Sequence, residues 1–432
     1  MDDTTHTTDE ASNHSDIDRR GFLRCMAWAG TSMVWSMNGG VPRSAITGDA
    51  SAKDDLFFVQ ISDSHIGFNK AANADVTETM RRAIAGINAL PATPSFLIHT
   101  GDITQLAKPS EFDTADQVLK ESRTRDVFFV PGEHDVGTDN GISYLERYGK
   151  KSGMPAGNGW YSFDHSGVHF IGLVNVLNLK AGGMGSLGAT QLAWLRDDVR
   201  HLASSTPIVV FAHVPLWSVY PAWGWGTDDS TQALGYLKRF GSVTVLNGHI
   251  HQTMQKVEGN VAFHTALSTA FPQPRPGTAP APGPMVVPAG HLADVLGIRE
   301  VHYLRHHNHL ATIDHTLSGA DPAQAMAQGE AAARAAASTT DSAKHTPADA
   351  RGQITIGNFA FNPKSLTIAK GGKVTWVNHD DTAHRVASAR NQFTASPLLD
   401  TNASFVATFE KAGEYPYFCS IHPTMTGKIV VG

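Results

Sequence analysis

Five short motifs between residues 63 and 251 place aspartate, glutamate or histidine directly after an apolar run. Carboxylates and imidazoles can hold a pair of divalent metal ions, because a carboxylate bridges two cations and imidazoles complete each shell without over-neutralising the charge. Such a pair lowers the pKa of bound water and makes a nucleophile available near neutral pH. The motifs therefore predict metal-assisted hydrolysis. They are Asp63-Ser64-His65, Gly101-Asp102, Gly132-Glu133-His134-Asp135, Ala212-His213 and Gly248-His249-Ile250-His251.

The motifs can act together only if the fold brings them to one place. Ligands of an open α/β sheet gather at the carboxyl ends of its strands, so side chains that follow strands can converge across almost two hundred residues. Gly101, Gly132 and Gly248 allow the sharp turns that such an approach needs. Taken singly, each motif is also compatible with a capping aspartate or a buried core histidine. The ordered set favours the metal site.

The same five motifs resemble those of the calcineurin-like metallophosphoesterases, over roughly residues 55 to 317. The resemblance implies two divalent or mixed-valence ions of Mn, Fe or Zn and a phosphate-ester substrate. It assigns His134 to protonation of the leaving group and Asp135 to holding the ring of His134. By the same likeness, the metal ligands are Asp63, His65 and His251 for the first ion, His213 and His249 for the second, and Asp102 as the bridge.

One position departs from this family pattern. The chain has Glu133 where the family has asparagine, a neutral ligand of the second ion. With Asp63, Asp102 and a bridging hydroxide, Glu133 would balance the four positive charges of two divalent ions. We expect such a site either to favour diesters over phosphate dianions or to hold one trivalent ion. The alternative is that Glu133 turns aside and binds nothing. Gln105 replaces the tyrosine of the purple subclass, so no tyrosinate colour is expected.

A second metal site is predicted near the C-terminus. Cys419, His422 and Met425 have the spacing C-x2-H-x2-M, and His384 lies upstream. A thiolate, two imidazoles and a distant thioether are the ligands of copper in a trigonal site with a weak axial bond. Residues 353–432 resemble the cupredoxins of the plastocyanin and amicyanin type, which implies one copper ion and electron transfer. The alternative is a buried free cysteine beside a surface histidine.

The apolar pattern predicts the elements that position these residues. We expect strands at 56–62, 95–100, 126–132, 168–174, 207–213 and 243–249, and helices at 73–90, 110–123 and 189–202. Continuous apolar strands indicate an α/β fold with the sheet covered on both faces. The phosphoesterase resemblance makes this a β-sandwich flanked by helices, to which the C-terminal segment adds an all-β cupredoxin sandwich. Trp223-Gly224-Trp225-Gly226 is interpreted either as lining the mouth of the active site or as a packed loop.

Composition and local patterns indicate four segments. They are an export signal at 1–52, a phosphoesterase domain at 53–319, an Ala-rich, semi-rigid linker at 320–350 and a cupredoxin domain at 351–432. A proline-rich stretch at 271–290 is expected to be an extended surface loop. The formal charge of −6 gives no general attraction for nucleic acid.

The N-terminal segment resembles a twin-arginine export signal. Arg19 and Arg20 precede Phe22, Leu23 and a short apolar run, and Ala50-Ser51-Ala52 offers a cleavage site. We therefore expect a periplasmic or extracytoplasmic protein with no membrane span unless the signal is retained. Cleavage would remove Cys25 and leave Cys419 as the one cysteine, without a disulfide partner.

The sequence leaves two functions open. The first is an exported dinuclear phosphoesterase, acting on a diester or monoester, that carries a type 1 copper domain. The second is an electron-transfer or copper-handling protein whose phosphoesterase-like site does redox chemistry or does not hydrolyse. Both functions allow a redox partner protein.

Overall fold

The computed structural model describes residues 33–38, 41–46, 56–149, 159–304, 309–340 and 352–432. Strands β1 (Met33–Asn38) and β2 (Val41–Ile46) form an antiparallel pair. The arginine pair of the predicted export signal, Cys25 and the expected cleavage site lie outside the described residues. Among the helices that the structure describes, none has the length and apolarity needed to cross a membrane.

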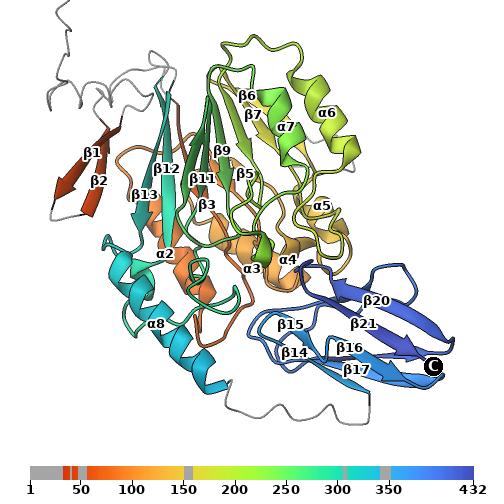
Figure 1. Cartoon of the computed structure of the whole chain (residues 1–432). Coiled ribbons are helices and arrows are strands. Elements are labelled where there is room, and N and C mark those ends of the chain that lie inside the picture. The colour runs from red at the N-terminus through yellow and green to blue at the C-terminus, as the bar shows by residue number, and fades with distance from the viewer. Residues whose placement is uncertain (1–32, 39–40, 47–55, 150–158, 305–308, 341–351) are drawn as a thin grey trace, which may run out of the picture.

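Two sheets form the larger part of the molecule (Figure 1). The strands of the first, in spatial order, are β13 (His309–Thr316), β12 (Gly297–Leu304), β3 (Leu56–Ile61), β4 (Leu97–His99) and β5 (Val127–Phe129). Those of the second are β10 (Gln255–Glu258), β11 (Val261–Thr265), β9 (Val243–Asn247), β8 (Ile208–Phe211), β7 (Val168–Gly172) and β6 (Tyr161–His165). All six predicted strands are present.

The continuous apolar strands are explained by burial on both faces. Successive side chains of a strand point to opposite sides of the sheet. In β8, Val209 and Phe211 pack into the cluster between the two sheets, whereas Ile208 and Val210 pack outward against helices. Each sheet therefore has the other sheet on one face and helices on the other, which gives the predicted β-sandwich flanked by helices.

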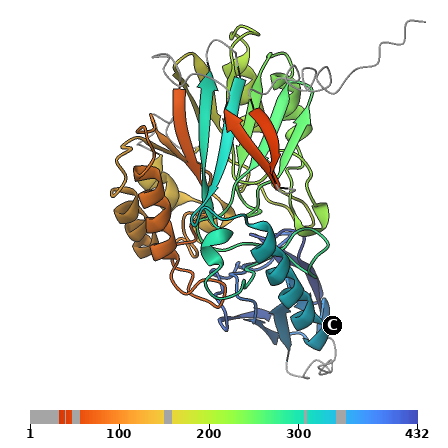
Figure 2. The same ribbon diagram turned by 90° about the vertical axis from the view of Figure 1, so that its left-hand side faces the viewer.

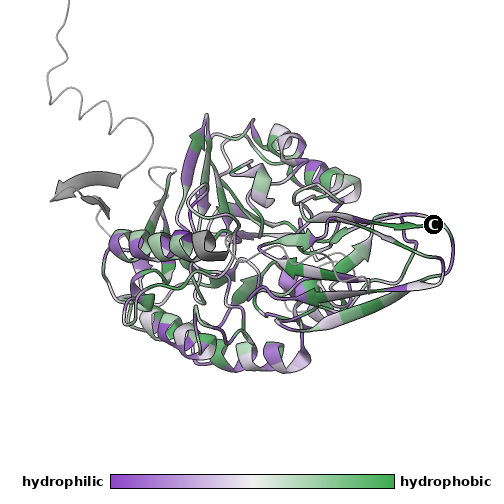
Figure 3. Cartoon of the chain, turned by 60° about the horizontal axis from the view of Figure 1, so that its bottom comes forward, coloured by the Kyte–Doolittle hydropathy of each residue, from purple (hydrophilic) through white to green (hydrophobic). Residues whose placement is uncertain are grey.

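Helices cover the outer face of each sheet. Helix α2 (Val76–Asn88) begins after Asp75, whose side chain accepts a hydrogen bond from the backbone N–H of Glu78. It packs with α3 (Pro109–Leu119) on the first sheet, while α6 (Ala189–Val199) and α7 (Ser230–Leu237) cover the second. The short helices α4 (Glu133–Val136) and α5 (Ile142–Tyr148) follow β5. In Figure 3 many strand segments are coloured green for hydrophobic residues, and the helices carry both green and purple (hydrophilic) residues.

The C-terminal region is a second, all-β sandwich. Its first sheet has the order β15 (Ala360–Asn362), β14 (Gln353–Gly357), β17 (Gly372–Asn378) and β19 (Ser404–Phe409). Its second has the order β16 (Ser365–Ile368), β21 (Thr426–Val431), β20 (Gly413–Cys419) and β18 (Val386–Ser388). Buried aromatic residues, Trp376 and Tyr417 among them, fill the space between the sheets. The sandwich lies below the larger domain in both side views (Figures 1 and 2).

Two predictions about the connecting segments need correction. The Ala-rich segment expected as a tether contains helix α8 (Ala323–Thr340), whose Ala325 and Met326 pack in a small apolar cluster with Met285 of the proline-rich stretch. Glu330 of α8 is buried and makes two hydrogen bonds to the guanidinium of Arg275, at 2.6 and 2.7 Å. Small alanine side chains let the helix approach closely, so a wide apolar stripe is not needed. The proline-rich stretch is a loop without helix or strand, as predicted, but its buried residues Met285 and Val287 pack against α8 instead of extending away from the fold.

Candidate metal centres

The five motifs of the larger domain meet at the carboxyl ends of parallel strands. Asp63 and His65 follow β3, Asp102 follows β4, and Glu133 opens α4 after β5, all from the first sheet. His213 follows β8 and the pair His249 and His251 follows β9, both from the second sheet. The site therefore lies where the two sheets come together, and each sheet supplies part of it.

The backbone at these positions is unusual. Five of the seven predicted ligands have positive φ, in the left-handed region that residues other than glycine seldom adopt. The residues are Asp63 (53°), His65 (42°), Asp102 (50°), His249 (71°) and His251 (54°). Residues held in this region carry strain, and such strain clusters at functional sites. Hydrogen bonds from the backbone N–H of Asp63 to Gly101 and of His65 to Asp102 hold the first two loops together.

The predicted ligands of the first ion form one group. His251 Nε2 lies 3.3 Å from Asp63 Oδ1, and the Nε2 atoms of His65 and His251 are 3.3 Å apart. Asp63, His65 and His251 are buried. Their ligand atoms all lie within 4.8 Å of one another, which suits a single metal ion.

The predicted ligands of the second ion form a neighbouring group that includes Glu133. Glu133 Oε1 is 2.9 Å from His249 Nδ1, and Oε2 is 3.0 Å from His213 Nε2. Asp102 Oδ2 lies 3.3 Å from His213 Nε2 and 3.6 Å from His65 Nε2, so this carboxylate faces both groups. Glu133 points into the site rather than turning aside. The structure thus places it among the residues that could hold the second ion.

Hydrogen bonds on the far side of the rings aim three histidines into the site. Nδ1 of His65 contacts Gln105 Oε1 at 2.9 Å, Nδ1 of His213 donates to the carbonyl of Thr100 at 2.7 Å, and Nδ1 of His251 donates to the carbonyl of Phe271 at 2.6 Å. Each bond leaves Nε2 facing the centre. Partners of this kind fix the tautomer of metal-binding histidines.

The buried carboxylates of this cluster are held in their charged form. Burial raises the pKa values of Asp63 and Glu133, but the adjacent histidines outweigh burial and hold both carboxyl groups below their usual range. Burial lowers the pKa of His213, yet Asp102 and Glu133 raise it well above its usual value. The one close partner of the buried Glu133 Oε2 among the described residues is His213 Nε2, at 3.0 Å. Buried carboxylates are stabilised by metal coordination, and these are surrounded by imidazole nitrogens, so the residues present fit two ions.

His134 and Asp135 behave differently from the prediction. The ring of His134 is held by the carbonyl of Gln105, 2.8 Å from Nδ1, which leaves Nε2 for the cavity. Asp135 points away and accepts hydrogen bonds from the N–H groups of Ile103, Thr104 and Gly132 and from the Thr104 hydroxyl. Consecutive helical residues project about 100° apart, so they cannot face the same partner. Asp135 therefore fixes loops around the site and does not hold the His134 ring.

The predicted copper ligands also come together. Cys419 Sγ lies 3.7 Å from Nδ1 of both His384 and His422, and these two nitrogens are 3.2 Å apart. Cys419, at the end of β20, is fully buried, and Met425, just before β21, is 4% exposed. Backbone hydrogen bonds from Cys419 to Met425 and from Met425 to His422 close this loop. The thiolate, imidazole and thioether set suits copper.

Neighbouring groups orient the copper ligands through hydrogen bonds. The carboxylate of Asp380 lies 2.8 Å from His384 Nε2, which leaves Nδ1 facing Cys419. Burial lowers the pKa of His384, but Asp380 and Cys419 outweigh it and raise the value to about 9. The backbone N–H of Arg385 points at Cys419 Sγ from 3.4 Å. Hydrogen bonds around a copper-binding cysteine tune its electronic properties.

The two centres share one small cavity of about 30 Å³. The rings of His134 and His422 are 6.1 Å apart, and ligand atoms of Glu133, His134 and His422 lie within 4.8 Å of one another. The predicted lining role of Trp223 and Trp225 is supported, since both residues border this cavity. The contact between the domains was not predicted. Hydrophobic periodicity describes the elements within a domain and carries no information on how two domains dock.

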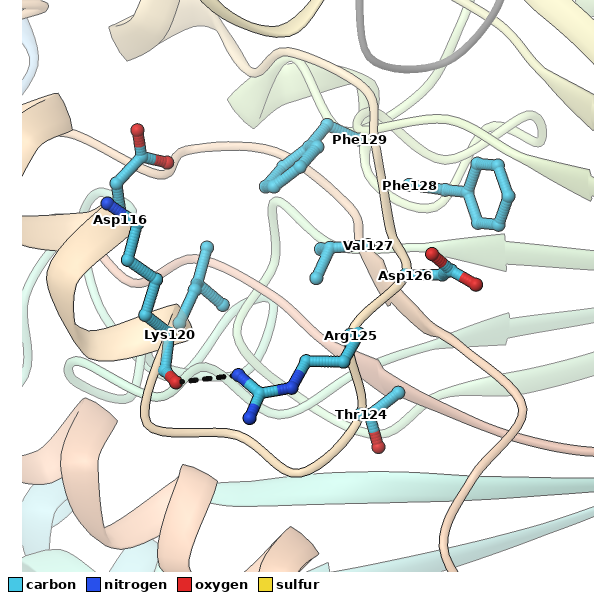
Figure 4. A pocket seen from close by; sticks show the side chains of 9 residues that line it. Asp116, Lys120, Thr124, Arg125, Asp126, Val127, Phe128 and Phe129 are labelled. Atoms are coloured by element: carbon cyan, nitrogen blue, oxygen red, sulfur yellow. Dashed lines mark hydrogen bonds between the residues drawn. The ribbon is translucent and has the colours of Figure 1, made fainter.

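A larger cavity of about 340 Å³ lies elsewhere, between the end of α3 and β5. Figure 4 shows its lining of charged and apolar side chains, in which the guanidinium of Arg125 hydrogen-bonds to the carbonyl of Lys120 at 3.4 Å. None of the histidine and carboxylate groups of the two metal centres borders it.

Sequence reasoning missed the role of Gln105. The family pattern marks this residue only as a replacement for tyrosine, yet its side chain orients His65 and its carbonyl orients His134. A polar residue three positions after a predicted bridging aspartate is the signal that could have suggested a supporting role.

Comparison with known proteins agrees with these two centres. Residues 58–253 match the calcineurin-like phosphoesterase family and residues 330–431 match the cupredoxin-like domain. An amicyanin-alpha from Methylorubrum extorquens is 30% identical over 113 residues, which cover 25% of this chain and 94% of that protein. A 3',5'-cyclic-nucleotide phosphodiesterase from Nostoc sp. is 25% identical over 50% of this chain and 79% of its own length. A glycerophosphodiester phosphodiesterase from Enterobacter lignolyticus is 26% identical over 45% of this chain and 71% of its own length.

Proposed function

Because the chain belongs to the calcineurin-like phosphoesterases over residues 58–253 and to the cupredoxins over residues 330–431, we propose that it is a dinuclear phosphodiesterase with a copper domain. The observation that carries this proposal is the pair of adjacent ligand groups joined by Asp102. One consists of Asp63, His65 and His251 and the other of Glu133, His213 and His249. Two such groups provide for two ions rather than one.

The proposed roles follow from the positions of the side chains. When bound, two divalent ions supply a water of lowered pKa and polarise a phosphoryl oxygen. Asp102 would fix the spacing of the ions, and Glu133 would reduce the net charge at the second. His134 directs Nε2 into the cavity and would donate a proton to the leaving oxygen, with its ring held by the Gln105 carbonyl.

Charge favours diesters as substrates. Asp63, Asp102 and Glu133 carry three negative charges against the four positive charges of two divalent ions. A bridging hydroxide would balance the remaining charge, so a diester anion would add one negative charge to the buried site whereas a monoester dianion would add two. The names of the two phosphodiesterase relatives agree with this choice.

A panel of mono- and diesters tests the proposal on protein with two ions bound. We expect diester hydrolysis that falls by about 10²- to 10⁴-fold in His134→Ala, because a positioned general acid contributes that much. His201→Ala is the matched control, since His201 is exposed and bonded only locally to Arg200. Metal-loaded protein that hydrolyses no diester, or a His134→Ala variant that keeps the full rate, would contradict the assignment.

A second function is favoured by the contact between the centres. The 6.1 Å separation of the His134 and His422 rings places the copper ligand beside the dinuclear site. A copper ion of this type exchanges one electron, so the phosphoesterase-like site could instead do redox chemistry with copper. Loss of all activity in Cys419→Ser, including diester hydrolysis, would favour this function over the first.

The proposal includes export of the protein by the twin-arginine route. The twin-arginine pattern at Arg19 and Arg20 and the copper domain both suit an extracytoplasmic protein that is folded before transport. Replacement of both arginines by lysine is expected to retain the protein in the cytoplasmic fraction. Unchanged secretion of that variant would argue against the twin-arginine route.

A further inference from the structure

The copper-binding face of the C-terminal domain closes the dinuclear site. His422, Phe359 and Thr382 of that domain border the shared cavity together with Glu133 and His134 of the larger one. The cavity has a volume of about 30 Å³, which is room for about two water molecules. A phosphodiester, with four oxygens on phosphorus and two organic groups, cannot enter that space.

His422 occupies the position from which a phosphoryl group would approach. Its Nδ1 faces Cys419 and His384, so its opposite edge is turned toward the larger domain. That edge meets Glu133 and His134, whose ligand atoms lie within 4.8 Å of the ligand atom of His422. His134 would contact the substrate there, and Glu133 would hold an ion beside it. The imidazole and a bound ester therefore compete for one space.

Apolar packing at this face includes Leu106 of the larger domain, which lies in the core cluster of the copper domain, and only a few polar contacts among the described residues accompany it. The backbone N–H of Gly182 donates to the carbonyl of Pro423 at 2.6 Å. Lys70 Nζ lies 3.5 Å from Asp400 Oδ1, and both side chains are more than a fifth exposed, at 23% and 38%. Exposed pairs of this kind contribute little. Interfaces between domains of one chain generally resemble transient ones, and relative motion is the default expectation.

We propose that docking of the copper domain and binding of a phosphoester at the dinuclear site exclude each other. This inference rests on the proposed function of that site. The coupling is reciprocal, because a ligand that binds only the open state must shift the molecule toward it. An anion at the dinuclear site therefore exposes His422, and a partner bound to the copper face opens the dinuclear site.

Inorganic phosphate tests the coupling in the intact protein with copper and two zinc ions bound. The readout is the rate at which a reduced c-type cytochrome, too large to enter the closed interface, bleaches the Cu(II) colour. We expect saturating phosphate to raise the rate by roughly tenfold or more, since minor open states are typically populated at 0.1–10%. Potassium chloride at equal ionic strength should leave the rate of copper reduction unchanged. Phosphate that binds, as shown by calorimetry, without changing the rate would overturn the proposal.

A larger side chain in the interface between the two domains provides an independent test. A Cβ at Gly137 would lie 2.9 Å from Leu398 Cδ2, and the helical backbone there, with φ of −64°, accepts any residue. Gly137→Leu should speed copper reduction without phosphate, as should Leu398→Ala, which removes the same contact. Gly235→Leu is the control, because Gly235 lies on an exposed helix face with nothing within 4 Å.

The outcomes separate this inference from the proposed function. Phosphate-dependent copper reduction without hydrolysis of any ester would sustain the mutual exclusion and refute the phosphodiesterase. Diester hydrolysis at wild-type rates in both interface variants, with copper reduction unchanged by phosphate, would sustain the phosphodiesterase and refute the mutual exclusion.

Discussion

Gly132→Ala is the substitution whose effect can be worked out most directly from the structure. The backbone of Gly132 has φ of −96° and ψ of 177°, which alanine adopts without strain. The added Cβ, however, would lie 2.0 Å from Asp102 Oδ1 and 2.4 Å from the Asp102 nitrogen. Because ordinary contacts begin at 3.4 Å, the carboxylate must retreat by about 1.4 Å. The clash therefore displaces the proposed bridging carboxylate and also presses on the backbone of Asp102.

A shift of that size should remove the bridge. Carboxylate oxygens bind such ions at about 2.0–2.2 Å, and a misplacement of 1 Å can lower a rate by about 10²-fold. We expect Gly132→Ala to bind fewer than two ions and to lose at least about 10²-fold in diester hydrolysis. Metal content by plasma mass spectrometry and initial rates measure both quantities.

The matched control is Gly235→Ala. No atom lies within 4 Å of that added Cβ, and the position is in helix α7, where alanine is favoured by about 1 kcal/mol over glycine. Metal content and rate should stay at wild-type values. A Gly132→Ala protein that folds, binds two ions and keeps the wild-type rate would refute the idea that Asp102 bridges the two groups.

Three further predictions concern separate parts of the molecule. Cys419→Ser should abolish the strong visible absorbance of the copper-loaded protein while leaving the dinuclear metal content unchanged; retained colour would place copper elsewhere. Glu133→Asn should weaken binding of the second ion and raise the monoester-to-diester rate ratio; unchanged metal content and preference would mean that Glu133 is not a ligand. Burial lowers the pKa of His169, but its contacts with Asp198 and Asp164 raise it above 6.5. Protonated His169 therefore stabilises the fold fully below pH 6.5, and this stabilisation is lost as pH rises through the raised pKa. Urea unfolding of Asp198→Asn should show less of this pH dependence than wild type; an equal dependence would count against it.

The sequence predicted the positions of the metal residues well, for a physical reason. A continuous apolar run marks a strand buried on both faces, and a polar residue immediately after it must lie at the strand end. The apolar pattern alone therefore assigns Asp63, Asp102 and His213 to one region of the fold. The predicted strands follow from the same periodicity, whereas the β-sandwich of the larger domain was implied by the resemblance to the phosphoesterases.

Other features depended on side-chain direction and could not be predicted. Asp135 lies next to His134 in the chain but points to the backbone of Ile103 and Thr104. The packing of α8 depends on a few small residues and on Glu330, which the helical period does not reveal. The contact of His422 with the dinuclear site arises from docking between two domains, and neither domain's pattern contains that information.

The central claim is that two metal ions lie between the two sheets, one in each ligand group. Diffraction from crystals of the metal-loaded protein, recorded on both sides of the metal absorption edge, locates such ions directly. We predict two anomalous peaks about 3.5–4 Å apart, with Asp102 between them and Glu133 on the peak nearest His213 and His249. A single peak, or two peaks with Glu133 turned away from both, would contradict the account.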